Sequence, residues 1–379
     1  QYAILYKIFI HASDKPQLLI VGDENQASYG SIGGKSLSLD EINEEFLGGN
    51  ITPFTFSDNY RSTQRLVDYF SPFRNVNGGI SKAKNKNASG TIRFFNQSVD
   101  KDYLADNIAH LIQQELDNGC SENDICVIAP KWEPIRAMTK KLITLLPDVK
   151  FDAPALSPFH GQQDSFWLTV AKLALTDPSG RLLTTRIKWA GEVIRQLTET
   201  YHHISELTPK KLLKLINSFQ SDTQVGTEYL KACFEFMVRE LEIELVTDKV
   251  LLENFELFFE KALANIERSE GQYEDTVTAL KSFFKESTGV VINTCHGVKG
   301  EEYKTVIAFG LLRGFIPHWN DIINRPVSVG RDSESKLLYV IASRAKENLY
   351  LFAEDGRRTQ NGNPYETSSL LNAYKYQYN

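Results

Sequence analysis

The chain contains 379 residues, of which 42% are hydrophobic and 24% are charged, and its formal net charge at pH 7 is −6. This ordinary globular composition excludes a disordered or fibrous protein, and the length suffices for two or three domains with buried cores. No apolar run approaches the roughly 18 to 20 residues of a membrane span and no leader pattern is present, so we expect a soluble, cytoplasmic protein. The acidic balance excludes a surface that is basic overall, so any contact with nucleic acid must be local.

The cysteines are scattered along the chain. No Cys-x-x-Cys pair occurs, so the spacing indicates neither a disulfide framework nor a structural zinc site, and no metal ligand is predicted. We interpret them as buried free thiols. They are Cys120, Cys126, Cys233 and Cys295.

The N-terminal segment, residues 1–48, predicts a helix, a strand and a loop. Residues 1–9 have amphipathic helical spacing, and the apolar run 18–21, bounded by Pro16 and Gly22, is typical of a buried strand in a parallel sheet. The segment is too short to be a domain by itself. We therefore expect it to complete a domain whose beginning is absent from the sequence.

Polar and aromatic side chains follow this strand at Asp23, Gln26 and Tyr29. A side-chain amide can both donate and accept hydrogen bonds, so Gln26 is suited to reach a terminal phosphate or the water that attacks it. A surface turn is the simpler alternative. The next segment, 30–36, imitates a phosphate-binding loop, but Gly-x-x-x-x-Gly-Lys-Ser would need a glycine where Tyr29 stands, so Lys35 is not expected to bind a nucleotide.

Strand and helix patterns then alternate. Apolar runs predict six strands, and apolar residues at helical spacing predict three helices between them. The strands are expected at 53–56, 91–95, 125–129, 290–294, 305–309 and 348–352, and the helices at 103–112, 135–145 and 334–346. This alternation predicts an α/β fold with a mostly parallel sheet that helices cover on both faces.

An all-helical insertion is predicted for residues 161–286, where the strand patterns disappear. Its aromatic and aliphatic stripes, such as Cys233 with Met237 and Phe255 with Phe258, are interpreted as the core of the insertion. Residues 359–379 predict a polar C-terminal tail.

Two arginines stand beside predicted helix ends. In Asp58-Asn-Tyr-Arg-Ser-Thr63, either Ser62 or Thr63 is suited to cap the helix that follows, but capping does not explain Arg61. Ser343-Arg-Ala345 supplies Arg344 late in the predicted helix 334–346. A surface ion pair would explain either arginine taken alone.

A third polar block, Thr294-Cys-His-Gly-Val-Lys-Gly-Glu-Glu-Tyr303, follows the predicted strand 290–294. His296 would ordinarily be a hydrogen-bonded core histidine, but its place between a strand and Lys299-Gly300 favours a cleft. An ion pair is the alternative for Lys299.

Together with the loop 18–30, these three blocks occur in the order found in one motor family, and the chain resembles the UvrD/Rep-type superfamily 1 DNA helicases. The resemblance implies a RecA-like P-loop NTPase-type fold and a site that binds ATP with Mg²⁺. It implies catalytic roles near the γ-phosphate for Gln26, Arg61 and Arg344, and a ribose or nucleotide contact for Glu302. It also implies that Tyr29 and His296 contact DNA, with His296 bridging to the glutamine, and that Lys299 contacts phosphate of nucleotide or DNA.

The sequence departs from the family pattern in several places. Ser31 and Ile32 stand where a tryptophan and an arginine are common, and Glu301 replaces the usual leucine. Neither a glycine-rich loop ending in Lys-Thr nor an Asp-Glu pair for magnesium is present, although Asp23-Glu24 lies in the sensing loop.

We therefore expect the C-terminal part of a helicase that moves 3′ to 5′ on single-stranded DNA in repair, replication or recombination, in the cytoplasm and associated with the nucleoid. The expected parts are the tail of a first motor domain, a second motor domain, a helical insertion and the tail. Their ranges are 1–48, 49–160 with 287–358, 161–286 and 359–379. The chain alone is predicted to be inactive. Two alternatives are a non-catalytic interaction module and the helicase part of a helicase-nuclease.

Overall fold

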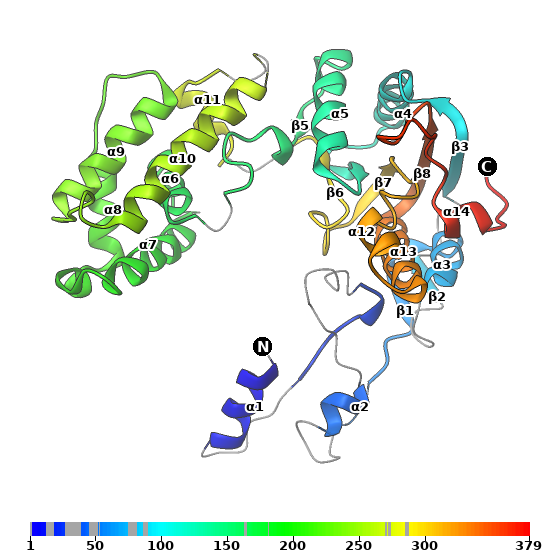
Figure 1. Cartoon of the computed structure of the whole chain (residues 1–379), viewed down its shortest axis with the longest axis horizontal. Helices are drawn as coiled ribbons and strands as arrows, with labels where there is room; N and C mark the ends of the chain where they lie inside the picture. The colour runs from blue at the N-terminus through cyan, green and yellow to red at the C-terminus, as the bar shows by residue number, and fades with distance from the viewer. Residues whose placement is uncertain are drawn as a thin grey trace. The chain divides into compact units, whose positions relative to one another are not determined.

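A computed structural model gives the structure of the chain (Figure 1). It describes residues 2–12, 19–26, 39–44, 52, 54–74, 82–85, 90–162, 165–180, 182–269, 271, 274–284 and 288–379. Two compact units are formed. We call residues 1–149 with 290–379 the sheet unit, and residues 150–289 the helical unit.

The sheet has six strands in the order β3-β8-β7-β4-β6-β5. They are β3 Thr91–Asp100, β4 Ile125–Ala129, β5 Phe151–Asp152, β6 Val290–Thr294, β7 Tyr303–Ala308 and β8 Ala345–Asp355. The pairs β3–β8, β8–β7, β7–β4 and β4–β6 are all parallel, and Val127 of β4 lies level with Ile292 and Ile307 of its neighbours. The predicted α/β fold and five of the six predicted strands are therefore confirmed.

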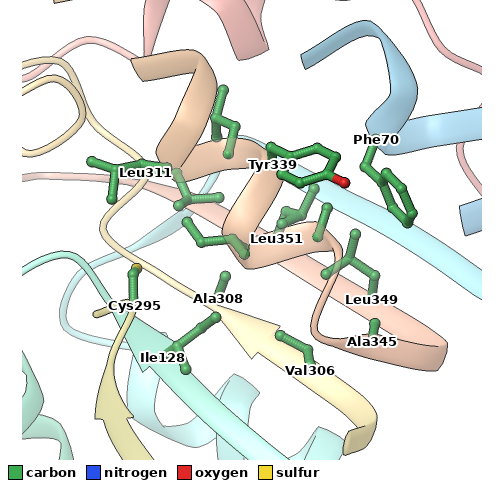
Figure 2. Close-up of a cluster of buried hydrophobic side chains, with 14 of the residues drawn as sticks. Phe70, Ile128, Cys295, Val306, Ala308, Leu311, Tyr339, Ala345, Leu349 and Leu351 are labelled. Atoms are coloured by element: carbon green, nitrogen blue, oxygen red, sulfur yellow. The ribbon is translucent and has the colours of Figure 1, made fainter. Parts of the chain in front are cut away.

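The sheet unit also contains helices, most of which bury apolar side chains. They are α3 Gln64–Phe70, α4 Leu104–Asp117, α5 Trp132–Leu145, α12 Trp319–Ile323, α13 Val327–Ala342 and α14 Ser369–Ala373. Short 3₁₀ turns add η4 Ser71–Phe73 and η5 Glu122–Asp124. Figure 2 shows Ile128, Val306 and Ala308 from the central strands in one buried cluster with Phe70 of α3 and Tyr339 of α13.

The helix predicted at 334–346 has other limits in the structure. It begins seven residues earlier, at Val327, and ends at Ala342 with Ser343 as its C-cap. The chain from Ala345 onward pairs with β7, and from Asn348 with β3 as well. The residues that the apolar pattern had assigned to the end of the helix therefore form hydrogen bonds in the sheet instead.

Two strands predicted near the N-terminus are wrong where the structure describes them. Residues 19–21 form no strand and are exposed, and residues 54–57 are irregular, with Phe54 and Phe56 both 77% exposed. Leu18 and Pro53 lie outside the described residues. A strand needs a hydrogen-bonded neighbour, and the described part of the chain pairs none with these runs.

The elements formed in this region are short. They are α1 Tyr2–His11, η1 Glu24–Gln26, α2 Leu39–Ile42, β1 Asp58–Thr63 and β2 Lys82–Asn85. The helix predicted at 1–9 is confirmed as α1. Strand β1 follows directly after the irregular residues 54–57 and pairs in parallel with β2.

The C-terminal residues pack on the sheet unit. The rings of Tyr374, Tyr376 and Tyr378 all lie within 6.0 Å of the ring of Tyr69 in α3. The backbone N–H of Asn379 donates to the carbonyl of Ile92 in β3 at 2.9 Å. The end of the chain thus covers part of the outermost strand.

The helical unit has its own core. Its helices are α6 Phe166–Leu175, α7 Leu183–Thr198, α8 Pro209–Ser218, α9 Gly226–Glu240, α10 Lys249–Arg268 and α11 Val277–Ser282, with 3₁₀ turns η6 Pro154–Leu156 and η7 His202–Glu206. Cys233, Met237, Phe255 and Phe258 belong to one buried cluster around Trp167. The prediction that the stripes of the insertion form a core is confirmed.

All four cysteines are buried and free, as predicted. Among the residues that the structure describes, no helix is long and apolar enough to cross a membrane.

Candidate functional site

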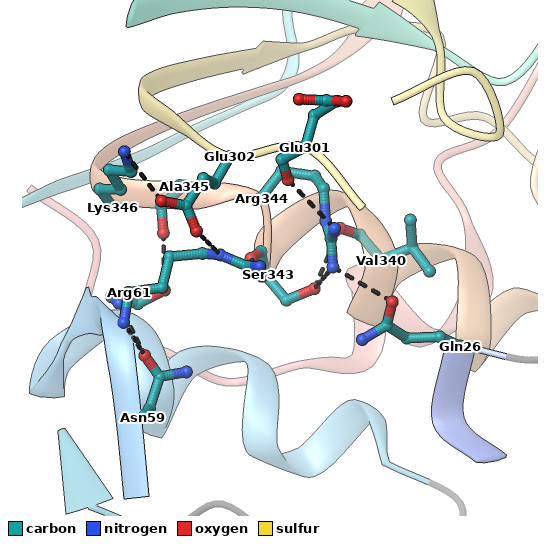
Figure 3. Close-up of polar contacts among 11 residues, drawn as sticks. Gln26, Asn59, Arg61, Glu301, Glu302, Val340, Ser343, Arg344, Ala345 and Lys346 are labelled. Carbon is teal, nitrogen blue, oxygen red and sulfur yellow. Dashed lines mark hydrogen bonds and ion pairs between the residues drawn. The ribbon is translucent and has the colours of Figure 1, made fainter. Parts of the chain in front are cut away.

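Arg344 lies at the junction between α13 and β8 and is only 1% exposed. Its guanidinium donates four hydrogen bonds, all to neutral oxygens (Figure 3). The acceptors are the carbonyls of Val340 (3.2 Å) and Glu301 (3.1 Å), the hydroxyl of Ser343 (3.1 Å) and Oε1 of Gln26 (3.3 Å). Burial, followed by the charge of Arg61, lowers the pKa of Arg344 to about 10.

Arg61 is held at the end of β1. The Asn59 side chain accepts hydrogen bonds from the backbone N–H groups of Arg61 (2.9 Å) and Ser62 (2.7 Å). Thr63 is the N-cap of α3 and accepts from the N–H of Leu66, which confirms one of the two predicted caps. Ser62 instead donates to the carbonyl of Ala345 at 2.7 Å, so β1 is tied to the first residue of β8.

The side chain of Arg61 has two partners. Its Nε donates to Oε2 of Glu302 at 2.8 Å, and its Nη1 donates to the carbonyl of Ser343 at 2.9 Å. Because Ser343 immediately precedes Arg344, the backbone of one residue brings the two arginines together. An ion pair, the alternative reading of Arg61, is thus present in the structure, but it is made with another residue of the predicted site.

Glu302 bridges two cations. Its Oε1 lies 3.0 Å from Nζ of Lys346, opposite the contact of Oε2 with Arg61. Hydrogen bonds from Arg61 first and Lys346 second hold the pKa of Glu302 below its usual range. Lys346 was not singled out from the sequence, although it lies only two residues after Arg344.

Gln26 reaches Arg344 from η1, which lies against α13. Its Nε2 donates to Oδ2 of Asp23 at 2.8 Å, and the N–H of Asn25 donates to Oδ1 of the same carboxylate at 3.0 Å. Asp23 therefore fixes the amide so that its oxygen points at the guanidinium. This orienting role of Asp23 was not predicted.

His296 and Lys299 lie on the loop 295–302 between β6 and β7. The N–H of Cys295 donates to the carbonyl of Ala129, and the N–H of Gly297 donates to Oγ1 of Thr294, so the loop begins in a fixed position. Burial and the charge of Lys299 lower the pKa of His296. The same loop ends in Glu301 and Glu302, which contact Arg344 and Arg61.

The structure thus brings four of the predicted site residues into one hydrogen-bonded network: Gln26, Arg61, Glu302 and Arg344. It places His296 and Lys299 on the adjoining loop. Tyr29 lies outside the described residues, as do Ser31, Ile32 and Lys35. Within the described ranges, no three His, Cys, Asp or Glu side chains are grouped so that they could hold a metal ion.

Comparison with known proteins relates part of the chain to one family. Residues 188–355 match the family of the UvrD-like helicase C-terminal domain. The match includes His296, Lys299, Glu302 and Arg344, and it runs from α7 in the helical unit to the end of β8 in the sheet unit. Gln26 and Arg61 lie outside it.

One relative is similar over a shorter stretch. Over 91 residues, the chain is 34% identical to the "Putative ATP-dependent DNA helicase YjcD" of Bacillus subtilis (strain 168). This stretch covers 24% of the chain and 12% of that relative, so the similarity spans a small part of the relative's length. Together with the parallel α/β sheet, the two matches confirm the resemblance drawn from the motifs: residues 188–355 are similar to the UvrD-like helicase C-terminal domain.

Proposed function

We propose that the chain is the C-terminal part of an ATP-dependent DNA helicase that moves 3′ to 5′ on single-stranded DNA and unwinds duplex in repair, replication or recombination. The observation that carries the proposal is the convergence of Gln26, Arg61, Glu302 and Arg344 from four distant segments into one network. A surface ion pair would bring two residues together. It would not bring a buried arginine and an oriented glutamine to the same place.

The proposed roles follow from the chemistry of phosphoryl transfer. Arg61 and Arg344 would stabilise negative charge that develops on the γ-phosphate, and a positioned arginine of this kind is worth about 10³ to 10⁵ in rate. Gln26, held by Asp23, would orient the attacking water or report the state of the γ-phosphate. ATP would arrive with Mg²⁺, whose ligands we do not assign to this chain.

The proposed DNA contacts come from Tyr29 and from the loop 295–302. Tyr29 would stack on a base, an interaction that tolerates any sequence and is worth about 1 to 3 kcal/mol per base. His296 and Lys299 would contact the strand from the loop 295–302. Because that loop also carries Glu301 and Glu302, a movement caused by nucleotide would reach the DNA contacts along the backbone of a few residues.

The chain alone is proposed to hydrolyse no ATP, because its sequence has no glycine-rich loop of the Gly-x-x-x-x-Gly-Lys-Thr form and no Asp-Glu pair in the expected context. The test is a DNA-stimulated ATPase assay on the chain alone and on the chain supplied with a polypeptide that carries both motifs from a UvrD-type first motor domain. We expect activity only in the second case.

Arg344→Ala, purified in the same way, serves as the control for contaminating ATPases. DNA-stimulated hydrolysis by the chain alone that this substitution abolishes would contradict the proposed inactivity. If a complemented chain that binds nucleotide hydrolyses none, the non-catalytic interaction module becomes the better reading.

A further inference from the structure

Three cations meet two carboxylates at the network around Arg344. Arg61 and Lys346 both contact Glu302, and the charge of Arg61 acts on Arg344. The second carboxylate, that of Asp23, accepts a hydrogen bond from the side-chain amide of Gln26. One positive charge is therefore left without a carboxylate of its own in this small region, which favours an additional anion.

The hydrogen-bond partners of the two arginines differ in a way that matters for such an anion. Arg344 is buried and bonded only to neutral oxygens, so its orientation is set by the fold. Arg61 is bonded to a backbone carbonyl and to the carboxylate of Glu302. Among these contacts, the carboxylate is the one that a competing anion can replace without unfolding the backbone.

Solvent exposure makes that replacement feasible. The side chain of Glu302 is 44% exposed, and those of Arg61 and Lys346 are 26% and 34% exposed. An ion pair of such exposure contributes little to stability. A phosphate chain carries several charges and accepts paired hydrogen bonds from a guanidinium, so it is the stronger partner for these cations.

We propose that Glu302 is an internal competitor for the phosphate site, and that Lys346 joins Arg61 and Arg344 as a third phosphate-binding cation. In the structure described here, the carboxylate stands in for a phosphate oxygen between Arg61 and Lys346. The inference rests on the proposed function, because the ligand occupies the same site. It differs from a nucleotide-supporting role of Glu302 in the sign of its effect, since a competitor weakens phosphate binding and a supporting residue strengthens it.

The competition would couple the two proposed ligands. When phosphate displaces Glu302, the end of the loop 295–302 is released from Arg61, while Arg344 still holds the carbonyl of Glu301. His296 and Lys299 lie on that loop. By thermodynamic linkage, a strand that holds the loop away from Arg61 would in turn favour phosphate binding.

The first experiment compares Glu302→Gln with Glu301→Gln in the full chain. Each substitution removes one negative charge from adjacent exposed positions, but Glu301 contacts Arg344 through its backbone carbonyl and not through its carboxylate. The probe is inorganic triphosphate, titrated calorimetrically at low ionic strength. We expect Glu302→Gln to bind about fivefold more tightly than wild type and Glu301→Gln to remain within about twofold of it.

Equal or weaker binding by Glu302→Gln overturns the competition, and so does the absence of triphosphate binding in all three proteins. An equal gain in both variants would point to net charge rather than to this contact, and it would overturn the inference as well. Far-UV circular dichroism and the thermal midpoint verify that each variant is folded.

The role of Lys346 is tested in the Glu302→Gln background, where its removal does not also loosen Glu302. Lys346→Ala is expected to lose most of the gain in triphosphate binding. Lys304→Ala is the matched control, because Lys304 is 36% exposed and lies 3.8 Å from the carboxylate of Glu347. If the two lysine substitutions have equal effects, Lys346 is not a phosphate ligand.

Failure of the inference can be told from failure of the proposed function. If Glu302→Gln tightens triphosphate binding while the complemented chain shows no DNA-stimulated ATPase activity, the anion site stands and the helicase proposal fails. If the complemented chain is active but Glu302→Gln does not tighten binding, the proposed function stands and the competition is wrong.

Discussion

Arg344 donates a hydrogen bond of 3.3 Å to Gln26, a residue 318 positions earlier in the chain. The guanidinium is buried, and the amide that it contacts is oriented by Asp23. A residue suited to sense phosphate and a residue suited to neutralise it are therefore in direct contact. The contact joins the N-terminal segment to the matched helicase domain and is the basis of the first prediction.

Arg344→Ala is expected to lower the free energy of unfolding by about 2 to 4 kcal/mol, because it empties a buried position and leaves several oxygens without a donor. The measurement is the urea midpoint of the transition assigned to the sheet unit. Arg358→Ala is the control, since Arg358 is exposed and its side chain donates to the carbonyl of Gly362. Equal stability of the two variants would contradict the buried network.

The C-terminal tyrosines are expected to stabilise the sheet unit. Tyr376 packs edge-on against Tyr69 at 4.9 Å, and its hydroxyl accepts a hydrogen bond from Arg65. Tyr376→Ala should cost about 1 to 3 kcal/mol in chemical denaturation. Tyr103, which is 68% exposed, supplies the comparison through Tyr103→Ala. A loss no larger than that of the control would mean that the tail adds no stability.

Glu115 is expected to stabilise the sheet unit through the hydrogen bonds of its carboxylate. It is 4% exposed, and its carboxylate accepts hydrogen bonds from Thr305 (2.8 Å), Asn348 (3.0 Å) and Tyr350 (2.8 Å). In Glu115→Gln an NH₂ group would face one of these donors, so we expect a loss of about 1 to 3 kcal/mol. The exposed Glu133→Gln on α5 should change stability by less than about 0.5 kcal/mol.

His296 is expected to be neutral at pH 7. Burial and Lys299 lower its pKa in the folded chain, whereas the unfolded chain keeps a value of about 6.5. The unfolded state therefore binds more protons, so stability is complete above about pH 6.5 and falls as the pH drops toward the lower folded pKa. A histidine NMR titration, with His296→Gln to assign the signal, measures this. A midpoint above 6.5 would reverse the sign.

Apolar runs in the sequence sufficed to predict the parallel sheet, because strands buried on both faces, such as Ile125–Ala129, are apolar throughout. The same pattern misled the interpretation of residues 18–21 and 53–56. Apolar content indicates that a segment favours burial, but a strand also needs a neighbouring strand, and the sequence pattern does not reveal which segments pair. The C-terminal limit of α13 was missed for a related reason. The pairing of β8 with β7 and β3 decides where the helix ends.

The candidate site was predictable as a set of residues and not as a set of contacts. The motifs singled out Gln26, Arg61, Glu302 and Arg344, which the structure brings together. They did not reveal that Glu302 bridges Arg61 and Lys346, because a contact across 241 positions depends on how β1 and β7 are placed. Asp23 was noted only as a neighbour of the glutamine, although its hydrogen bond sets the direction of the amide.

The register of the sheet shows where the loop 295–302 begins and where it ends. Thr294 lies level with Ala129 at the carboxyl end of β4, whereas Thr305 lies level with Ile125 at its amino end. The loop 295–302 therefore runs from the carboxyl rim of the sheet back to its amino rim. Ligands of open α/β sheets ordinarily bind at the carboxyl rim, but Glu302, Arg344 and Lys346 gather where β7 and β8 begin. His296 follows the carboxyl end of β6, so the loop 295–302 connects a predicted DNA contact at one rim with the residues that gather at the other.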